Sequence, residues 1–399
     1  MNSDKIKFLM FIVVASTIGQ IAAEIYVPSL PFISHDFQVS NSLVQISIAV
    51  FLFGMGVPGI FFGYISDYFG RRKILLITTS ISSLGTLLCV IAPNIYILIL
   101  GRLVQGLGFS GVGSLGRAIL RDRMSGVDLA KYASNLAIIT VLVVDLSPFV
   151  GGFLQEYFGW RPIFAILFLY NLFAIYASYQ FHEEHTRPTE SLQLSKIFIT
   201  TWQILHDKTF VKYNLLSSLT YAAIMLYLAV ASFLFEGKLG LSPTEFGTTT
   251  LGLSFVFMFG SFLNGRLLHY LKIKSLIQSG VTLMCLAALF ALALATILPL
   301  TYIGLIVFVA LVYLASSALF SNSSALAFSN SDKSVGIASA LYSSLQVLTA
   351  AVFSALISLF HVNSTLPLAI FMLIIVVVMV LVLQIKSHEN IQLENRKKN

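Results

Sequence analysis

Long apolar runs separated by short polar connections dominate the sequence. A helix needs about 20 mostly apolar residues to cross a bilayer, and twelve runs reach that length. In the first half they are 8–30, 42–65, 74–92, 95–118, 132–154 and 162–181, and in the second half 210–235, 245–264, 275–297, 301–323, 336–360 and 366–385. The pattern predicts an all-α integral membrane protein with twelve transmembrane helices.

One long polar stretch, HEEHTRPTESLQLSKIFITTWQILHDK, follows the sixth run and divides the spans into two sets of six. We therefore expect an N-terminal six-helix bundle over 1–181 and a cytoplasmic linker over 182–209. A C-terminal six-helix bundle follows over 210–385, and a cytoplasmic tail covers 386–399.

Charge is scarce in this chain and lies mostly on one side. Only 10% of the residues are charged and 57% are hydrophobic, against about 25% charged in a soluble domain. When both termini are placed in the cytoplasm, all 24 basic residues except Arg102, Arg161 and Lys238 fall on that side. Basic residues favour the cytoplasmic side of a membrane protein, so this bias predicts the orientation. The net charge of +7 then faces the inner leaflet, which argues against a nucleic-acid partner.

Motifs typical of enzymes fail on their context. GLGFSG and GVGSLG, over 106–116, fit the dinucleotide-binding pattern but lie inside a span, where close helix packing explains the glycines better. HEEH (182–185) lacks the spacing of a zinc helix motif, and two cysteines, Cys89 and Cys285, cannot form a metal quartet. The chain also has no G-x-x-x-x-G-K-[ST] motif. We expect no enzyme activity and no cofactor, with a proton gradient as the energy source.

Three charged residues lie deep in the predicted spans: Glu24, Arg102 and Asp145. A fixed cation in the membrane costs about 2.5–3.5 kcal/mol, so Arg102 needs a partner or a water-filled cavity. At a rise of about 1.5 Å per residue, Arg102 lies about 10 Å from the outer face, Glu24 about 9 Å and Asp145 about 14 Å. The three therefore fall in one layer, where two carboxylates can hold one arginine and one can exchange a proton. The alternatives are that Glu24 only reaches the interface, that Asp145 only holds Arg102, and that Arg102 is a permanent structural cation.

The connection between the second and third spans reads GYISDYFGRRKILL, residues 63–76. Gly63 and Gly70 permit a tight turn, and Asp67 lies close to Arg71 and Arg72. A carboxylate beside several cations can pair in one conformation and release in another, which predicts a conformational latch. The alternative is a basic loop that only follows the positive-inside rule.

This connection resembles the loop signature of the major facilitator superfamily, and LILGRLVQGLG (98–108) resembles the fourth-helix signature of that superfamily. SPFVGGFLQEYFGWRPIF (147–164) resembles the fifth-helix antiporter motif, through Pro148, Gly151 and Gly152, and the W-R-x-x-F after it. EIYVPSLP, GRAILRD and GIASALYSSLQ are similar to segments of the bicyclomycin-resistance (Bcr/CflA) group of drug:proton antiporters. Ser147 and Val143 depart from the fifth-helix motif, and Asn264 stands in the second half where Asp67 stands in the first.

The resemblance implies the major facilitator fold, in which two pseudo-symmetric six-helix bundles rock about a site near the midplane. It also implies a central cavity lined by the first, fourth, seventh and tenth spans. Side chains expected to line that cavity are Tyr26, Gln105, Tyr221, Tyr227, Ser317, Ser321 and Asn322. For the hydroxyl groups, the alternative is a hydrogen bond to their own backbone or to a neighbouring helix.

The favoured function is therefore a proton-coupled antiporter that exports a small amphipathic drug, or a metabolite such as a siderophore, by alternating access. A proton-coupled importer or facilitator of a small polar nutrient is the first alternative, and a receptor or assembly factor without transport is the second. We expect a multi-pass monomer in the bacterial inner membrane with both termini in the cytoplasm. Its partners are a small-molecule substrate, protons and the lipid bilayer.

Overall fold

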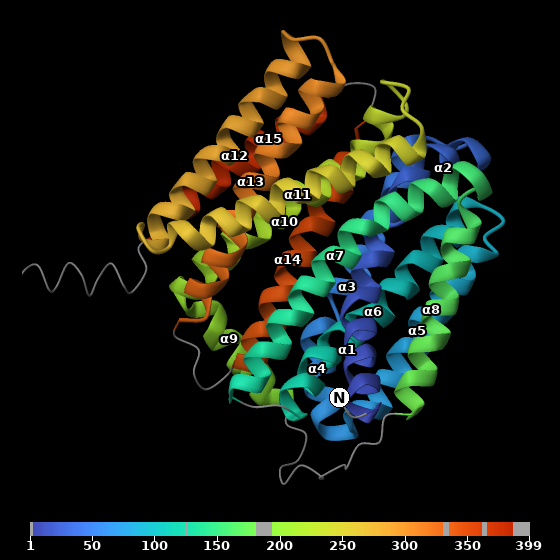
Figure 1. Cartoon of the computed structure of the whole chain (residues 1–399), viewed down its shortest axis with the longest axis vertical. Helices are drawn as coiled ribbons and strands as arrows, with labels where there is room; N and C mark the ends of the chain where they lie inside the picture. Colours follow the sequence, from blue (N-terminus) through green and yellow to red (C-terminus); the bar gives the residue numbers. More distant parts are fainter. Residues whose placement is uncertain (1–2, 124–125, 181–193, 330–334, 361–364, 386–399) are drawn as a thin grey trace, which may run out of the picture. The chain divides into compact units, whose positions relative to one another are not determined.

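The computed structural model describes residues 3–123, 126–180, 194–329, 335–360 and 365–385, and within them regular structure is entirely helical (Figure 1). Among these described residues, eleven helical segments are long and apolar enough to cross a membrane, and the 16-residue helix α3 is a shorter apolar helix. This agrees with the predicted all-α membrane fold. The first-half helices are α1 (Ser3–Glu24), η1 (Val27–Ser29), α2 (Leu30–Asp36), α3 (Asn41–Gly56), α4 (Gly59–Phe69), α5 (Arg71–Val90), α6 (Ile95–Arg123), α7 (Gly126–Phe158) and α8 (Arg161–Gln180). The others are α9 (Leu194–His206), α10 (Lys208–Phe235), α11 (Pro243–Leu267), α12 (Ile273–Thr296), α13 (Tyr302–Ala327), α14 (Val335–Ser358) and α15 (Leu366–Leu383).

Two of the predicted spans contain a break in their α-helix, although the described residues Ile12–Asp36 still form one segment long enough to cross a membrane. The predicted span 8–30 ends its α-helix at Glu24 and continues as a short 3-10 helix that contains Pro28. The predicted span 42–65 is divided between α3 and α4 at Val57 and Pro58. Proline has no backbone N–H and its ring collides with the preceding turn, which accounts for both breaks.

The predicted linker contains a helix that the sequence analysis did not anticipate. This helix, α9, exposes large apolar side chains along one side, and Phe198 and Trp202 are each more than 60% exposed. A single residue, Asp207, separates it from α10. The predicted linker segment 182–193 lies outside the described residues.

The helices pack as two compact units. The first is Met1–Leu192 with Leu228–Leu251 and Ser354–His361, and the second is Gln193–Tyr227, Gly252–Phe353 and Val362–Asn399. The first unit thus combines the first-half helices with the C-terminal end of α10, the N-terminal end of α11 and the end of α14. The division into bundles over 1–181 and 210–385 stays a prediction.

Glycines place α6 in direct backbone contact with α3 and α5. A Cβ atom on Gly106 would overlap the carbonyl oxygen of Phe51, and one on Gly108 would overlap the backbone of Ser82. Small residues allow membrane helices to approach this closely, and the packing replaces the dinucleotide interpretation of GLGFSG. The helix that carries Arg102 is consequently held between two neighbours at backbone distance.

Candidate functional site

Arg102 is fully buried and is bound by a carbonyl, an amide and two aromatic rings. Its Nη1 donates to the carbonyl oxygen of Ala22 (2.9 Å) and to Oε1 of Gln105 (2.6 Å). Its guanidinium carbon lies 4.2 Å from the ring centre of Tyr26 and 3.9 Å from that of Phe51. Cation–π contacts of this kind strengthen when they are shielded from water, so these partners stabilise the cation where it is buried.

Gln105 extends this hydrogen bonding to two further helices. Its side-chain nitrogen donates to Thr86 on α5 (2.9 Å), and Thr86 also accepts from Asn171 on α8 (3.1 Å). Asn171 accepts in turn from Ser82 (2.7 Å), and all of these side chains are buried. Ser82, Thr86 and Asn171 were not predicted from the sequence, although an amide inside the apolar run 162–181 was an available signal.

Glu24 lies at the end of α1, and Asp145 lies within α7. The two carboxylates are near enough for their charges to interact. The described partners of Arg102 are therefore a carbonyl, an amide and two rings, whereas the described electrostatic partner of Glu24 is a second acid. That arrangement can bind a proton on one of two interacting acids, whereas the buried cation is stabilised by other groups.

The fifth-helix residues lie where α7 approaches other segments of the first unit most closely. Pro148 lies inside α7, and a Cβ atom on Gly151 would overlap the carbonyl oxygen of Ile25. A Cβ atom on Gly152 would overlap the carbonyl oxygen of Pro243, and one on Gly247 would lie 2.6 Å from the carbonyl oxygen of Pro148. The absence of side chains at these glycines thus permits α7 to lie directly against the start of α11.

Segment Leu228–Leu251 packs against α3 and the C-terminal end of α7. The predicted orientation puts this packing on the outer side of the membrane, so we call it the outer closure. Besides the glycine contacts, Gln45 donates to the carbonyl oxygen of Ala229 (2.9 Å), and Glu156 accepts from the backbone N–H of Thr244 (3.1 Å). All of these residues belong to the first unit. The closure therefore joins late segments of the chain to its first half.

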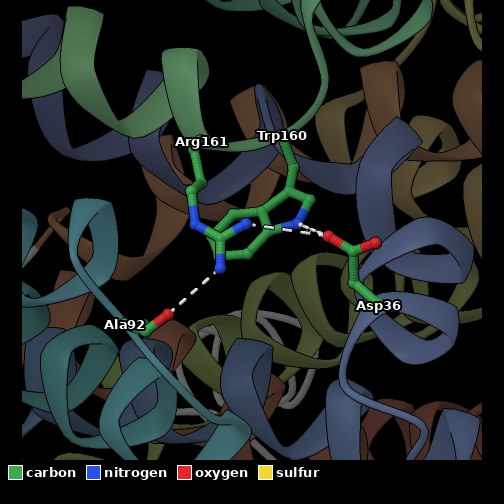
Figure 2. Close-up of polar contacts among 4 residues, drawn as sticks. All are labelled: Asp36, Ala92, Trp160 and Arg161. Carbon is green, nitrogen blue, oxygen red and sulfur yellow. Dashed lines mark hydrogen bonds and ion pairs between the residues drawn. The ribbon is translucent and has the colours of Figure 1, made fainter.

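A cluster of polar and aromatic groups joins three connections near the end of the first unit that also carries the outer closure (Figure 2). Asp36 accepts from the indole nitrogen of Trp160 (2.9 Å) and lies 3.7 Å from Nη1 of Arg161, which also donates through Nη2 to the carbonyl oxygen of Ala92 (3.3 Å). The guanidinium of Arg161 lies over the Trp160 ring. We call these four residues the clasp.

An aromatic chain leads from the clasp to Arg102. The ring of Trp160 is 6.0 Å from that of Phe164, and Phe164 is 5.6 Å from Tyr26, the ring on which Arg102 stacks. The W-R-x-x-F segment thus has a structural account: its tryptophan and arginine form the clasp and its phenylalanine supports Tyr26.

The predicted latch is described in part. Gly70 joins α4 to α5 with a φ of 94°, a conformation that favours glycine. Arg71 donates to the hydroxyl of Ser66 (2.6 Å), and Arg72 donates to the carbonyl oxygen of Tyr179 (2.6 Å) and lies over its ring. Asp67 and Gly63 lie in α4, but their side-chain surroundings are outside the described part of the structure, so the latch stays a prediction.

The predicted cavity residues of the tenth span make helix–helix contacts. Ser321 accepts from the side chain of Asn264 on α11 (3.1 Å), and Asn322 donates to the same side chain (2.8 Å). Ser317 donates to the carbonyl oxygen of Leu314 and faces Gly260, where a Cβ atom would overlap its hydroxyl. The alternative given for these hydroxyls, bonding to backbone or to a neighbouring helix, matches these contacts.

The predicted tyrosines of the seventh span differ in their surroundings. Tyr227 is fully buried, and its hydroxyl has no hydrogen-bond partner among the described residues. Tyr221 is half-buried, with its ring 6.5 Å from that of Phe320. Tyr26 and Gln105, also predicted for the cavity, are partners of Arg102, and their place in a cavity stays a prediction. Among the described residues, no group of three His, Cys, Asp or Glu side chains could hold a metal ion.

Comparison with known proteins identifies the family to which the chain is similar. The family model of the Major Facilitator Superfamily matches residues 12–354. An uncharacterized MFS-type transporter of Bacillus subtilis, YdgK, is 29% identical over 86% of this chain and 86% of its own length. A bicyclomycin resistance protein homolog of Haemophilus influenzae is 24% identical over 92% and 93% of the two chains, and multidrug resistance protein D of Escherichia coli is 28% identical over 65% and 66%.

Solved structures agree on the fold. The crystal structure of a D-xylose-proton symporter aligns with a TM-score of 0.73 at 15% identity, covering 95% of this chain and 97% of the symporter. A bacterial homolog of the human lysosomal transporter Spinster, in an inward-facing and unoccupied conformation, aligns with a TM-score of 0.74 at 16% identity over 96% of each chain. At these identities the likeness concerns the fold alone.

Proposed function

The chain belongs to the Major Facilitator Superfamily, and from this premise we propose that it is a proton-coupled antiporter that exports a small amphipathic drug or metabolite. The names of the resistance-protein relatives support export over import of a nutrient. The proposal places the protein in the bacterial inner membrane, as a monomer with both termini in the cytoplasm.

One observation carries the proposed coupling: Glu24 and the buried cation Arg102 have different described partners. Arg102 is bound by neutral groups, whereas Glu24 interacts with Asp145. Because like charges repel strongly where water is scarce, loss of a proton from one acid works against its loss from the other. We assign the exchanged proton to this pair, with Glu24 as the carrier. In this scheme Arg102 keeps its carbonyl, amide and aromatic partners.

Substrate and proton would alternate at this pair while the two halves rock about it. A cationic substrate would displace the proton by charge, and a neutral one by changing the hydration of the acids. Tyr221 and Tyr227 are the aromatic surfaces that we propose for the substrate in the second half. Ser317, Ser321 and Asn322 take a structural role in this scheme, because their hydrogen bonds serve helix packing.

Gradient-driven uptake into inside-out vesicles tests the proposal. Vesicles with an acidic lumen should accumulate ethidium, a cationic probe, and a protonophore should abolish that accumulation. Glu24→Gln should lose accumulation but keep binding of a neutral probe, chloramphenicol, measured by equilibrium dialysis. Glu245→Gln, which alters an exposed acid, serves as the control and should transport normally. Undiminished accumulation in both Glu24→Gln and Asp145→Asn would reject the pair as the coupling site.

The proposed orientation has its own test. Cysteines introduced for the exposed residues Tyr157 and His269 should react with an impermeant maleimide from the outside and from the inside of the cell, respectively. The reverse pattern would overturn the orientation.

A further inference from the structure

Glu236 is a buried acid that the proposed transport cycle does not use. It directly follows α10, the helix that ends at Phe235, so it lies at the outer end of this span. Both of its carboxylate oxygens are shielded from solvent, and neither has a hydrogen-bond partner in the described part of the chain. The residue as a whole is only partly buried, because its backbone and aliphatic side-chain carbons reach the surface.

The residues that precede Glu236 in the chain belong to the outer closure. Phe235 is fully buried and stacks on Phe246 of α11 at 5.6 Å. One turn before Glu236, the hydroxyl of Ser232 is also buried without a partner among the described residues, and Ala229, two turns before, accepts the hydrogen bond from Gln45. Residues 229, 232 and 236 are spaced so that their side chains share one face of the helix, and the backbone of Ala229 is held by α3 through Gln45.

Charged groups near the outer closure are engaged elsewhere or exposed. They are His35, Asp36, Glu156, Arg161, Lys238 and Glu245, all of which are exposed. Asp36 pairs with Arg161, and Glu156 and Glu245 each accept from a backbone N–H. None of these described contacts reaches Glu236. Burial therefore dominates its protonation and raises its pKa from 4.5 to about 9.

We propose that Glu236 is a proton-binding site of the outer closure, which takes up one proton from the outside when the closure forms and releases it when the closure opens. The inference rests on the alternating-access cycle proposed above, in which the closure must separate to release substrate to the outside. Separation would expose the carboxylate to water, where it ionises like an ordinary glutamate. Its proton is then replaced from the external medium before the closure can form again.

The pH dependence follows from the two protonation states. An exposed glutamate loses its proton near 4.5, whereas Glu236 in the closure keeps its proton up to a pKa of about 9. Between these values, formation of the closure takes up one proton, so the open-to-closed ratio rises about tenfold per pH unit. The stabilisation is complete below pH 4.5 and is lost as the pH approaches 9. For an exporter, an acidic exterior would thus return the empty protein to its inward-facing state.

Spin labels across the outer closure test this inference. Tyr157 on α7 and Thr248 on α11 are exposed and flank the closure, so each is replaced by a spin-labelled cysteine after Cys89 and Cys285 are changed to alanine. Pulsed electron paramagnetic resonance in lipid nanodiscs then measures the distance distribution at pH 5.5 and pH 8.5. Three pH units at about tenfold each predict a several-hundredfold rise of the long-distance population relative to the short one, so the parent should show an increase of at least tenfold at the higher pH.

Three variants test whether Glu236 itself carries the pH response. Glu236→Gln, which mimics the protonated form, should reduce the change to less than twofold, whereas Glu245→Gln should respond like the parent. Glu236→Asp keeps a titratable group and should retain the response, which guards against a folding defect in the glutamine variant. A full response in Glu236→Gln, or no response in the parent, would overturn the inference.

The same labels distinguish this inference from the proposed coupling pair. If Glu24→Gln abolishes the pH response and Glu236→Gln does not, the proton of the closure belongs to Glu24, and the inference fails while the proposed function stands. If Glu24→Gln and Asp145→Asn keep gradient-driven export and Glu236→Gln loses the pH response, the coupling pair fails and the inference stands.

Discussion

Replacing Tyr26 tests how much the aromatic surroundings of Arg102 contribute to the protein. Tyr26→Phe removes the hydroxyl with its contacts to Ser47 (3.2 Å) and Arg102, and an interhelical hydrogen bond in a membrane protein averages about 0.6 kcal/mol. Tyr26→Leu also removes a shielded cation–π contact, at about 2 kcal/mol, and the ring contact with Phe164, at about 0.5–1.5 kcal/mol. The free energy of unfolding of the leucine variant should therefore be about 2.5–3.5 kcal/mol lower than that of the phenylalanine variant.

Reversible unfolding in mixed micelles, followed by circular dichroism, measures this difference directly. The phenylalanine variant is the matched control, because it keeps the ring and most of the volume. A double-mutant cycle with Phe51→Leu should give a coupling between the two rings, since both contact the same guanidinium. If the leucine and phenylalanine variants unfold within about 0.5 kcal/mol of each other, the rings do not stabilise Arg102 and the reasoning is wrong.

Three further predictions concern packing, a helix end and the latch. Gly106→Ala should cost about 1–3 kcal/mol or more in unfolding free energy, because its Cβ meets a backbone carbonyl, whereas Gly113→Ala, with open space around it, should be neutral or stabilising. Lys212→Met should destabilise α15 by about 1.5–3 kcal/mol, because Lys212 donates to the carbonyl oxygens of Leu383 and Ile385 (both 2.8 Å). The control Lys238→Met alters an exposed lysine and should change the free energy of unfolding by less than about 0.5 kcal/mol. Asp67→Asn should slow ethidium transport while leaving its binding affinity within about twofold, and a large loss of affinity would contradict a latch role.

The membrane spans could be predicted because lipid leaves few alternatives to an apolar helix. The breaks within them could not be placed with the same certainty. Pro58 separates α3 from α4, yet Pro148 lies inside the continuous helix α7. Neighbouring helices decide whether a membrane helix tolerates its proline, and that context is absent from the local sequence.

The depth of the charged residues in the membrane could be predicted, but the direction of their side chains could not. Helix rise fixes the depth of a residue from its position in the chain, so Glu24, Arg102 and Asp145 could be assigned to similar depths. The direction in which each side chain points depends on how the helices are rotated, and that rotation follows from contacts such as Gly106 with Phe51. The aromatic partners of Arg102 and the network through Asn171 were consequently out of reach of the sequence analysis.

The aromatic chain from the clasp to Arg102 has a consequence for how this protein can evolve. A bacterium selected on a new toxic compound need not alter the residues that touch it. A change at Trp160 or Arg161 would loosen Phe164 and Tyr26 in turn, and so shift the surroundings of Arg102 from a distance. Adaptive substitutions should therefore accumulate in the W-R-x-x-F segment as well as in the cavity, and a survey of resistant isolates restricted to cavity residues would overlook them.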